Sequence, residues 1–264
     1  MTVQLWGIIN ATPDSFYDGN PANTLDTLLV RAQALVQAGA DVLDIGGEST
    51  RPTSTPVSAT EELARVLPLI KALRARETKT PLSLDTRHVS VAKAGLENGV
   101  SIINDVSGNP SPELFSLVKK HNAQLVLMHT RGTPQTMQTQ TDYTDLVGEV
   151  YDFLAEKISQ AQAAGLTKNQ LIIDVGFGFA KDRTQNYNLL NNLYYFKKLG
   201  IRLLVALSRK SFLSQAGDTP QERLPQTLAA HLTALQQGAD ILRAHDVKET
   251  RQLLNFYRET EATQ

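Results

Sequence analysis

The sequence has no cysteine and no large excess of charge of either sign. Without cysteine, thiolate nucleophiles, disulfides and cysteine-ligated zinc are excluded. The 26 lysines and arginines nearly balance the 27 aspartates and glutamates, so no excess charge is available for nonspecific nucleic-acid binding. Any anionic ligand must therefore be bound by a local group of cations.

Long apolar runs are also missing, and the first residues lead us to expect no leader sequence. No stretch approaches the ~18 apolar residues of a membrane-spanning helix, and the N-terminus has no basic region followed by an apolar one. We therefore expect no membrane partner and a cytoplasmic location. Of the 264 residues, 41% are hydrophobic and 20% are charged, which is typical of a globular protein with a sizeable core.

A helix followed by a glycine and a short apolar run recurs along the chain. Residues 24–38 have helical apolar spacing, begin beside the capping candidates Asn23 and Thr24, and end at Gly39. Asn122, which tolerates the left-handed conformation, takes the place of the glycine in one repeat. The eight predicted strands are Val3–Ile9, Asp41–Ile45, Pro81–Leu84, Ile102–Asn104, Leu125–Met128, Leu171–Asp174, Leu203–Val205 and Ile241–Arg243.

Eight strand and helix units in one chain predict an α/β fold, a single (β/α)₈ TIM barrel. No change of composition, linker or low-complexity tract divides the sequence, so we expect one domain over residues 1–264. A doubly wound open sheet is the alternative architecture.

Polar residues end most of the predicted strands, where barrels of this kind carry their chemistry. Three cations near one rim suit a phosphate-bearing substrate, and carboxylates and amides suit a ring with several hydrogen-bonding edges. We therefore expect a small ligand, anionic at one end and heteroaromatic at the other. The polar residues are Asn10, Asp44, Asp85, Asn104, His129, Asp174, Ser208, Arg209, Lys210, Arg243 and His245.

Some of these residues have simpler interpretations. Asp44 is interpreted as a residue that pairs near the barrel mouth, and no spacing of histidine and aspartate resembles a zinc site. Ser208 lacks the G-x-S-x-G elbow of a serine nucleophile, and Gly176-Phe177-Gly178 lacks the third glycine of a dinucleotide fingerprint. The histidines interpreted as structural or exposed are His88, His121, His129 and His231.

Two long polar loops follow the first two strands, at residues 10–23 and 46–57. Loops of this length in a compact domain are either disordered or act as lids. The first loop carries Phe16 and the second carries Arg51, and both side chains are suited to contact a ligand. We therefore predict that both loops are lids.

Eight ordered motifs cover the chain from the first strand to the last helix, and together they resemble the dihydropteroate synthases, a family of pterin-binding enzymes. The motifs are Asn-Ala-Thr-Pro-Asp-Ser-Phe at 10–16, Asp-Ile-Gly-Gly-Glu-Ser-Thr-Arg-Pro at 44–52, Leu-Asp-Thr at 84–86, Ile-Ile-Asn-Asp-Val at 102–106, Leu-Met-His at 127–129, Gly-Phe-Gly-Phe at 176–179, Ser-Arg-Lys-Ser at 208–211 and Arg-Ala-His-Asp-Val-Lys-Glu-Thr at 243–250.

The resemblance implies a transferase of folate biosynthesis that joins 7,8-dihydropterin-6-ylmethyl diphosphate to 4-aminobenzoate and releases diphosphate. It implies an SN1-like path assisted by Mg²⁺, with no protein nucleophile. Catalytic roles are implied for Asp85, Lys210, Arg51 and Phe16. The residues implied to bind the pterin are Asp85, Asn104, Met128, Asp174, Phe179 and Lys210.

The resemblance also implies sites for the other groups. Mg²⁺ would be held by Asn10 and Asp18. The arylamine carboxylate would lie at Ser211 and at the N-terminus of a helix that begins near Arg209. Residues implied to bind diphosphate are Asn10, Thr50, Arg51, Arg243 and His245. Those implied to bind 4-aminobenzoate are Phe16, Pro52, Phe179, Ser208, Arg209 and Ser211.

The implied partners are these small molecules, together with a second copy of the chain in a homodimer. The dimer would pack through the last helices, and sulfonamides would compete with 4-aminobenzoate. The residues expected to offer an apolar surface there are Leu253, Leu254, Phe256 and Tyr257.

The chain departs from the family pattern at a few positions. Glycine is usual where this chain has Ala180 and Ala206, and proline is usual where it has Val175. A methyl group at Ala206 is expected to press on the pterin face. Two alternatives stay open, a pterin-binding paralogue without catalysis and a corrinoid-linked methyltransferase, although the Ser-Thr-Arg-Pro loop argues against the second.

Overall fold

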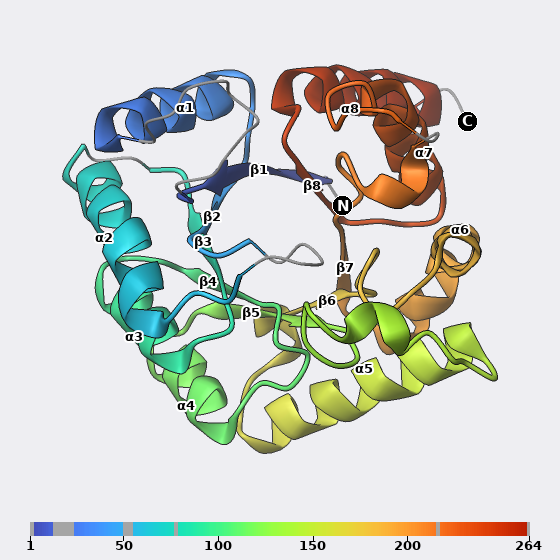
Figure 1. The fold of residues 1–264 in the computed structure, drawn as a ribbon, viewed down its shortest axis with the longest axis horizontal. Helices are drawn as coiled ribbons and strands as arrows, with labels where there is room; N and C mark the ends of the chain where they lie inside the picture. Colours follow the sequence, from blue (N-terminus) through green and yellow to red (C-terminus); the bar gives the residue numbers. More distant parts are fainter. Residues whose placement is uncertain (1–2, 13–23, 50–54, 77–78, 215–216, 263–264) are drawn as a thin grey trace.

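Eight parallel strands close into a barrel in sequence order, and β8 pairs back with β1. A computed structural model describes residues 3–12, 24–49, 55–76, 79–214 and 217–262. Figure 1 shows the strands at the centre and the helices as an outer ring. The predicted (β/α)₈ barrel is therefore confirmed, and the open sheet is excluded because both edges of the sheet are paired.

All eight predicted strands are present, with ends that differ from the predictions by no more than two residues. Each is a short run of buried apolar residues, as expected for a parallel sheet covered by helices. The strands are β1 (Gln4–Asn10), β2 (Val42–Gly46), β3 (Leu82–Thr86), β4 (Ile102–Asp105), β5 (Gln124–Met128), β6 (Leu171–Asp174), β7 (Arg202–Val205) and β8 (Ile241–Ala244).

The helices begin and end where local chemistry places them. Thr24 caps the first helix, where its Oγ1 accepts a hydrogen bond of 3.3 Å from Thr27 N, and Gly39 follows the last turn with a φ of +99°. Asn122 is left-handed at a φ of +49°, as predicted. The helices are α1 (Leu25–Gln37), α2 (Ala59–Ala75), α3 (Val89–Glu97), α4 (Pro112–Lys120), α5 (Leu146–Ala163), α6 (Arg183–Asn191), α7 (Leu224–Gln236) and α8 (Val247–Glu261).

Alternation along the strands sorts side chains between the barrel interior and the helix layer. The interior holds a small apolar cluster around the fully buried Trp6. On the even-numbered strands this cluster contributes one layer, which we call the apolar layer: Val42, Ile102, Ile172 and Ile241. Two residues further along the same strands lie the members of what we call the polar layer: Asp44, Asn104, Asp174 and Arg243.

No helix among the described residues combines the length and the apolar character needed to cross a membrane.

Candidate active site

Arg243 organises the polar layer through two carboxylates. Its Nε donates to Asp44 Oδ2 and its Nη2 donates to Asp85 Oδ2, each at 2.6 Å. Asn104 Nδ2 also donates to Asp44 Oδ2, at 3.3 Å. Asp44 is fully buried, so it pairs as predicted, but its partner is the cation of the candidate site. The signal that assigns Asp44 to the site is its place on the same alternate-strand layer as Asn104 and Asp174.

A hollow opens at the polar layer, and three members of that layer, Asn104, Asp174 and Arg243, line it. All six residues predicted to bind a pterin line it, together with one residue predicted to bind diphosphate. Ala206 lines it too, as expected, whereas Val106 was not predicted. The lining residues are Asp85, Asn104, Val106, Met128, Asp174, Phe179, Ala206, Lys210 and Arg243.

Burial and the neighbouring charges set the ionisation of the site. Burial raises the pKa of Asp85 to about 7, although the adjacent Arg243 acts to lower it. Burial also raises the pKa of Asp174, against a hydrogen bond from Gly176 N. The pKa of Arg243 is raised because the charges of Asp44 and Asp85 outweigh its burial. Arg243 is therefore a permanent cation, whereas Asp85 titrates near neutral pH.

One wall of the hollow is apolar with a cation above it. Phe179 is 8% exposed, and Lys210 Nζ lies 4.6 Å from the centroid of its ring. Phe179 belongs to a small cluster with Met128, which also lines the hollow. A planar ligand in this hollow would thus meet apolar surface at Phe179 and Met128 and hydrogen-bonding groups at Asp174, Asn104 and Lys210.

The residues after β7 and β8 are joined to one another. Ser208 Oγ accepts a hydrogen bond of 3.1 Å from His245 N. Arg209 Nε donates to Asp246 Oδ2 at 2.9 Å, so this guanidinium is part of an ion pair. Ser208, Arg209, Ser211 and His245 are not among the described residues that line the hollow.

The predicted helix N-terminus near Arg209 is wrong. Arg209 has a left-handed φ of +58°, which breaks a helical path, and its N–H donates to Thr227 Oγ1 at 3.1 Å. Only the 3₁₀ turn Ser211–Leu213 follows, and α7 begins at Leu224. The first turn of α7 nevertheless contacts Arg209, since Arg223, which precedes α7, donates from Nη1 to Arg209 O at 3.0 Å.

The residues predicted for the two lids are only partly described. Asn10 ends β1, paired in register with Gly46. Within the described parts of the chain, no group of three or more histidines and acidic residues could hold a metal. The predicted residues that lie outside the described ranges are Phe16, Asp18, Thr50, Arg51 and Pro52.

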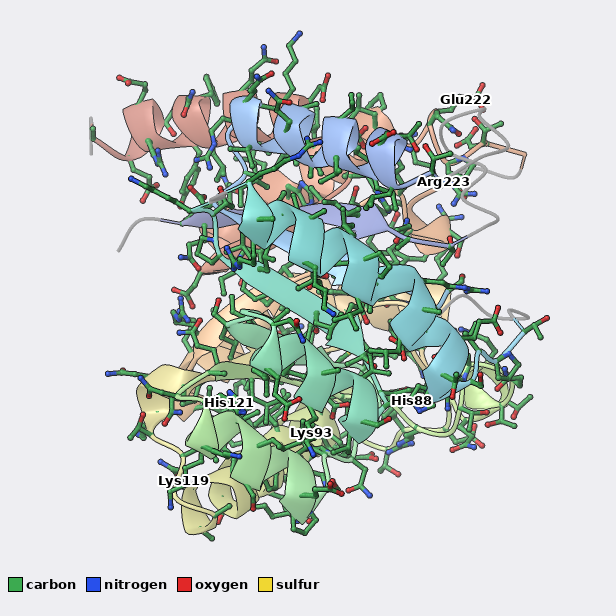
Figure 2. The ribbon with its side chains drawn as sticks, turned by 90° about the vertical axis from the view of Figure 1, so that its left-hand side faces the viewer. His88, Lys93, Lys119, His121, Glu222 and Arg223 are labelled. Carbon is green, nitrogen blue, oxygen red and sulfur yellow. The ribbon has the colours of Figure 1, made fainter. Side chains whose placement is uncertain are left out.

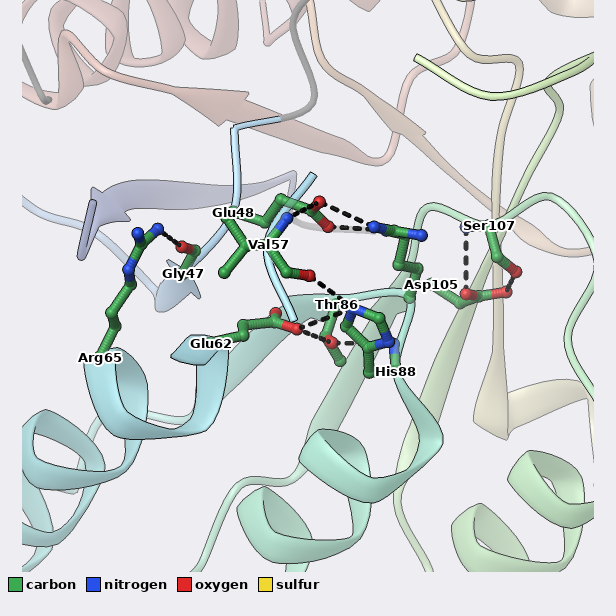
Figure 3. Close-up of polar contacts among 10 residues, drawn as sticks. Gly47, Glu48, Val57, Glu62, Arg65, Thr86, His88, Asp105 and Ser107 are labelled. Carbon is green, nitrogen blue, oxygen red and sulfur yellow. Dashed lines mark hydrogen bonds and ion pairs between the residues drawn. The ribbon is translucent and has the colours of Figure 1, made fainter. Parts of the chain in front are cut away.

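A second polar cluster lies outside the barrel beside the end of β3, and it was not predicted (Figure 3). Glu48 Oε1 accepts from Val57 N at 2.9 Å, and Glu48 Oε2 accepts from Arg87 Nε at 2.7 Å. Alternation explains the cluster, because Asp85 faces inward and the next residue, Thr86, faces outward. We call it the outer cluster, and it consists of Glu48, Val57, Glu62, Thr86, Arg87 and His88.

The histidines are widely separated. His88 Nε2 donates to Val57 O at 3.1 Å in the outer cluster, while His129 and His231 are buried. Figure 2 shows His121 at the opposite end of the barrel from His88. These four histidines therefore lie apart from one another, which is consistent with structural roles or surface positions.

Comparison with known proteins covers the whole of this barrel. The family model described as pterin binding enzyme matches residues 6–245. A dihydropteroate synthase of Synechocystis is 46% identical over 94% of this chain and 86% of its own length. A dihydropteroate synthase of Escherichia coli is 40% identical over 96% of this chain and 90% of its own length.

Solved structures give the same result. The Yersinia pestis dihydropteroate synthase in complex with a sulfonamide drug superposes with a TM-score of 0.93 at 40% identity, covering 100% of this chain and 95% of that chain. The Xanthomonas albilineans dihydropteroate synthase with 4-aminobenzoic acid has a TM-score of 0.91 at 40% identity, covering 99% of this chain and 94% of that chain.

Proposed function

We propose that the hollow binds the pterin substrate, because this chain belongs to the pterin-binding enzymes. Within that family it belongs to the dihydropteroate synthases, which are transferases of folate biosynthesis. The reaction would join 7,8-dihydropterin-6-ylmethyl diphosphate to 4-aminobenzoate. The observation that carries the proposal is the gathering of all six predicted pterin residues around one hollow.

Recognition of the pterin follows from the groups that line the hollow. Asp174 Oδ1 accepts from Gly176 N, and the carboxylate would accept further hydrogen bonds from the ring N–H and amino groups of the pterin. A heterocycle without those donors would lose these charge-assisted hydrogen bonds. Asn104 and Lys210 present an amide and an ammonium to other edges of the ring. The site therefore selects a flat ring with donors on one edge and acceptors on another.

The chemical step that we propose is dissociative. The carbon–oxygen bond at the 6-methylene breaks first, and its electron pair leaves with diphosphate. The amine of 4-aminobenzoate then attacks the cation and loses a proton. Asp85, in its ionised form, would stabilise the developing cation, and a normal α-secondary deuterium isotope effect at the methylene would support this path.

Diphosphate would be bound at the rim by Arg243 and His245 and, from the second loop, by Thr50 and Arg51. Within the described residues, Nη1 of Arg243 makes no hydrogen bond, which suits contact with a phosphate oxygen. The amide oxygen of Asn10 is a hard donor, and Mg²⁺ needs only one or two protein oxygens when phosphates and waters complete its shell. Asn10, with Asp18, would thus hold Mg²⁺, which neutralises charge on the leaving group when bound.

The arylamine would pack against Phe16, Pro52 and Phe179. Its carboxylate would lie at Ser211, in a pocket shaped by Ser208 and Arg209. The Xanthomonas protein was crystallised with 4-aminobenzoic acid and the Yersinia protein with a sulfonamide drug, which supports competition between these ligands here. Phe16→Ala should raise the KM for the arylamine more than the KM for the diphosphate, and equal effects would contradict this placement.

One experiment tests the function as a whole. Titration calorimetry with the pterin diphosphate is paired with an assay for diphosphate release in the presence and absence of 4-aminobenzoate. A synthase binds the pterin and releases diphosphate as dihydropteroate forms. Binding without release would identify a non-catalytic paralogue, and no binding at all would refute the proposal.

The homodimer and the cytoplasmic location stay predictions. Phe256 on α8 is 60% exposed, which supports packing of a partner there, but Leu254 is fully buried in the core and offers no surface. Light scattering on Phe256→Asp, compared with the unchanged chain, tests the dimer. A monomeric unchanged chain would contradict it.

A further inference from the structure

Lys181 is a buried lysine that no substrate role accounts for. It is 2% exposed, and its Nζ lies 3.0 Å from Gly176 O, 2.9 Å from Phe179 O and 2.9 Å from His129 Nδ1. Among the described residues, no carboxylate forms a salt bridge with it. A buried cation without a paired carboxylate costs free energy, so its hydrogen bonds must compensate that cost.

The hydrogen bonds of Lys181 hold the turn that follows β6. Gly176 N donates to Asp174 Oδ1 at 2.8 Å, while Gly176 O accepts from Lys181. Phe179, the apolar wall of the hollow, has its carbonyl bound by the same ammonium. One amine therefore binds the carbonyl of Gly176, the residue whose N–H anchors the Asp174 carboxylate, and the carbonyl of Phe179, the residue whose ring forms the apolar wall.

The backbone of this turn is unusual and needs such support. Gly176 has a φ of +71°, and a Cβ on it would lie 1.9 Å from His129 O, so only glycine fits there. Ala180 is left-handed at a φ of +50°, a conformation that costs an L residue about 1–2 kcal/mol. Tyr143 Oη donates to Ala180 O at 3.0 Å, which adds a second support.

The turn is tied to the barrel through His129. His129 N donates to Asp174 O at 2.9 Å, and burial lowers the pKa of His129 to about 2, so its ring is neutral. Its Nδ1 can then accept a hydrogen bond from the Lys181 ammonium. Burial lowers the pKa of Lys181 to about 7, and both its charged and neutral forms retain the two donors that the carbonyls need.

We propose that Lys181 is a positioning residue of the pterin site, which sets the orientation of the Asp174 carboxylate and the Phe179 ring by binding Gly176 O, Phe179 O and His129 Nδ1. The proposal rests on the proposed function of the hollow. Lys181 does not line the hollow itself, so it acts through residues that do.

The test is the affinity of Lys181→Met for the pterin diphosphate without arylamine, measured by calorimetry well below the unfolding temperature. Methionine fills the volume but leaves both carbonyls without their donor. We expect the Kd to rise about tenfold or more, since one to two lost hydrogen bonds of about 1 kcal/mol each are transmitted to the ligand contacts.

Lys157→Met is the matched control. Lys157 is also buried, at 8% exposed, and its Nζ donates to Asn109 Oδ1 at 3.0 Å, away from the hollow. The Lys157→Met variant should be less stable than the unchanged chain but should bind the pterin diphosphate with the same Kd. If Lys181→Met fails to fold, the double variant Ala180→Gly with Lys181→Met relieves the left-handed alanine and is measured against Ala180→Gly alone.

The outcomes separate this proposal from the proposed function. If the unchanged chain does not bind the pterin diphosphate, the proposed function fails. If it binds and Asp174→Asn weakens binding, but Lys181→Met matches the unchanged chain, the positioning role is wrong. Equal weakening in Lys181→Met and Lys157→Met would also overturn it, because it would show a general loss of order.

Discussion

The apolar and polar layers of the barrel interior lie two residues apart on the same four strands, yet they differ in what holds them. Ile172 and its neighbours pack against other apolar side chains, and any of them is replaceable by a residue of similar shape. Asp44 of the polar layer is fully buried and pairs with Arg243, which also binds Asp85 of the neighbouring strand β3. The comparison teaches that a distance of two residues along a strand separates the part of the core that stabilises the fold from the part that carries the chemistry.

Arg243→Met should have the largest effect of the variants considered, because it replaces the cation of the polar layer with an apolar side chain. The fully buried Asp44 would then lose its cation, which costs about 3–5 kcal/mol of stability, and Asp85 would lose its ion pair as well. Diphosphate release should become undetectable, as measured on protein still folded at low temperature. Arg87→Met is the control, since it also removes an arginine that pairs with a carboxylate, but its side chain is 33% exposed and it should lower stability less than Arg243→Met. Equal losses in the two variants would contradict the special place of Arg243.

Glu62, in the outer cluster, is a fully buried acid like Asp44, but no arginine or lysine among the described residues forms a salt bridge with it. Its Oε2 lies 4.0 Å from His88 Nε2. Burial raises its pKa from 4.5 to about 7. The folded state therefore holds a proton that the unfolded state releases between these pH values, so stability falls as pH rises from about 4.5 to 7. The loss is on the order of 3 kcal/mol.

The measurement for Glu62 is urea unfolding at a series of pH values. Glu62→Gln should remove this part of the pH dependence and be relatively more stable above pH 7. A variant with the same pH slope as the unchanged chain would show that Glu62 is not the titrating group.

Asp174→Asn keeps the shape of the polar layer and removes one charge. Loss of charge-assisted hydrogen bonds should weaken pterin binding by about 1.5–3 kcal/mol, measured by calorimetry. Asp105→Asn is the matched control, because Asp105 is 1% exposed but does not line the hollow. A weaker effect at Asp174 than at Asp105 would contradict the assignment.

Ile172→Val is the smallest change and tests the apolar layer alone. Removing one buried methylene should cost about 0.5–1.5 kcal/mol of stability, measured by thermal unfolding. The pterin Kd should stay the same, since the layer does not line the hollow. A clear loss of affinity would show that the two layers are not independent.

Much of this division could be predicted from the sequence. The repeat of helix, glycine and apolar run gives the barrel, and the polar ends of the strands give Asp174, Asn104 and Lys210 as residues of one rim. What could not be predicted are contacts between distant residues. Arg243 and Asp44 are 199 positions apart, and their pairing depends on closure of the barrel. The wrong helix start near Arg209 has a local cause, because nothing in Ser-Arg-Lys-Ser signals a left-handed arginine.

The joining of Glu48 to Val57 has a consequence for how this barrel can change. The Glu48 carboxylate accepts hydrogen bonds both from Val57 N and from the Arg87 guanidinium, which lie 9 and 39 positions further along the chain. One side chain therefore holds together the chain after β2, the chain before α2 and the end of β3. A substitution at Glu48 alone would release two distant segments at once, so this position tolerates change less readily than its place in a loop suggests.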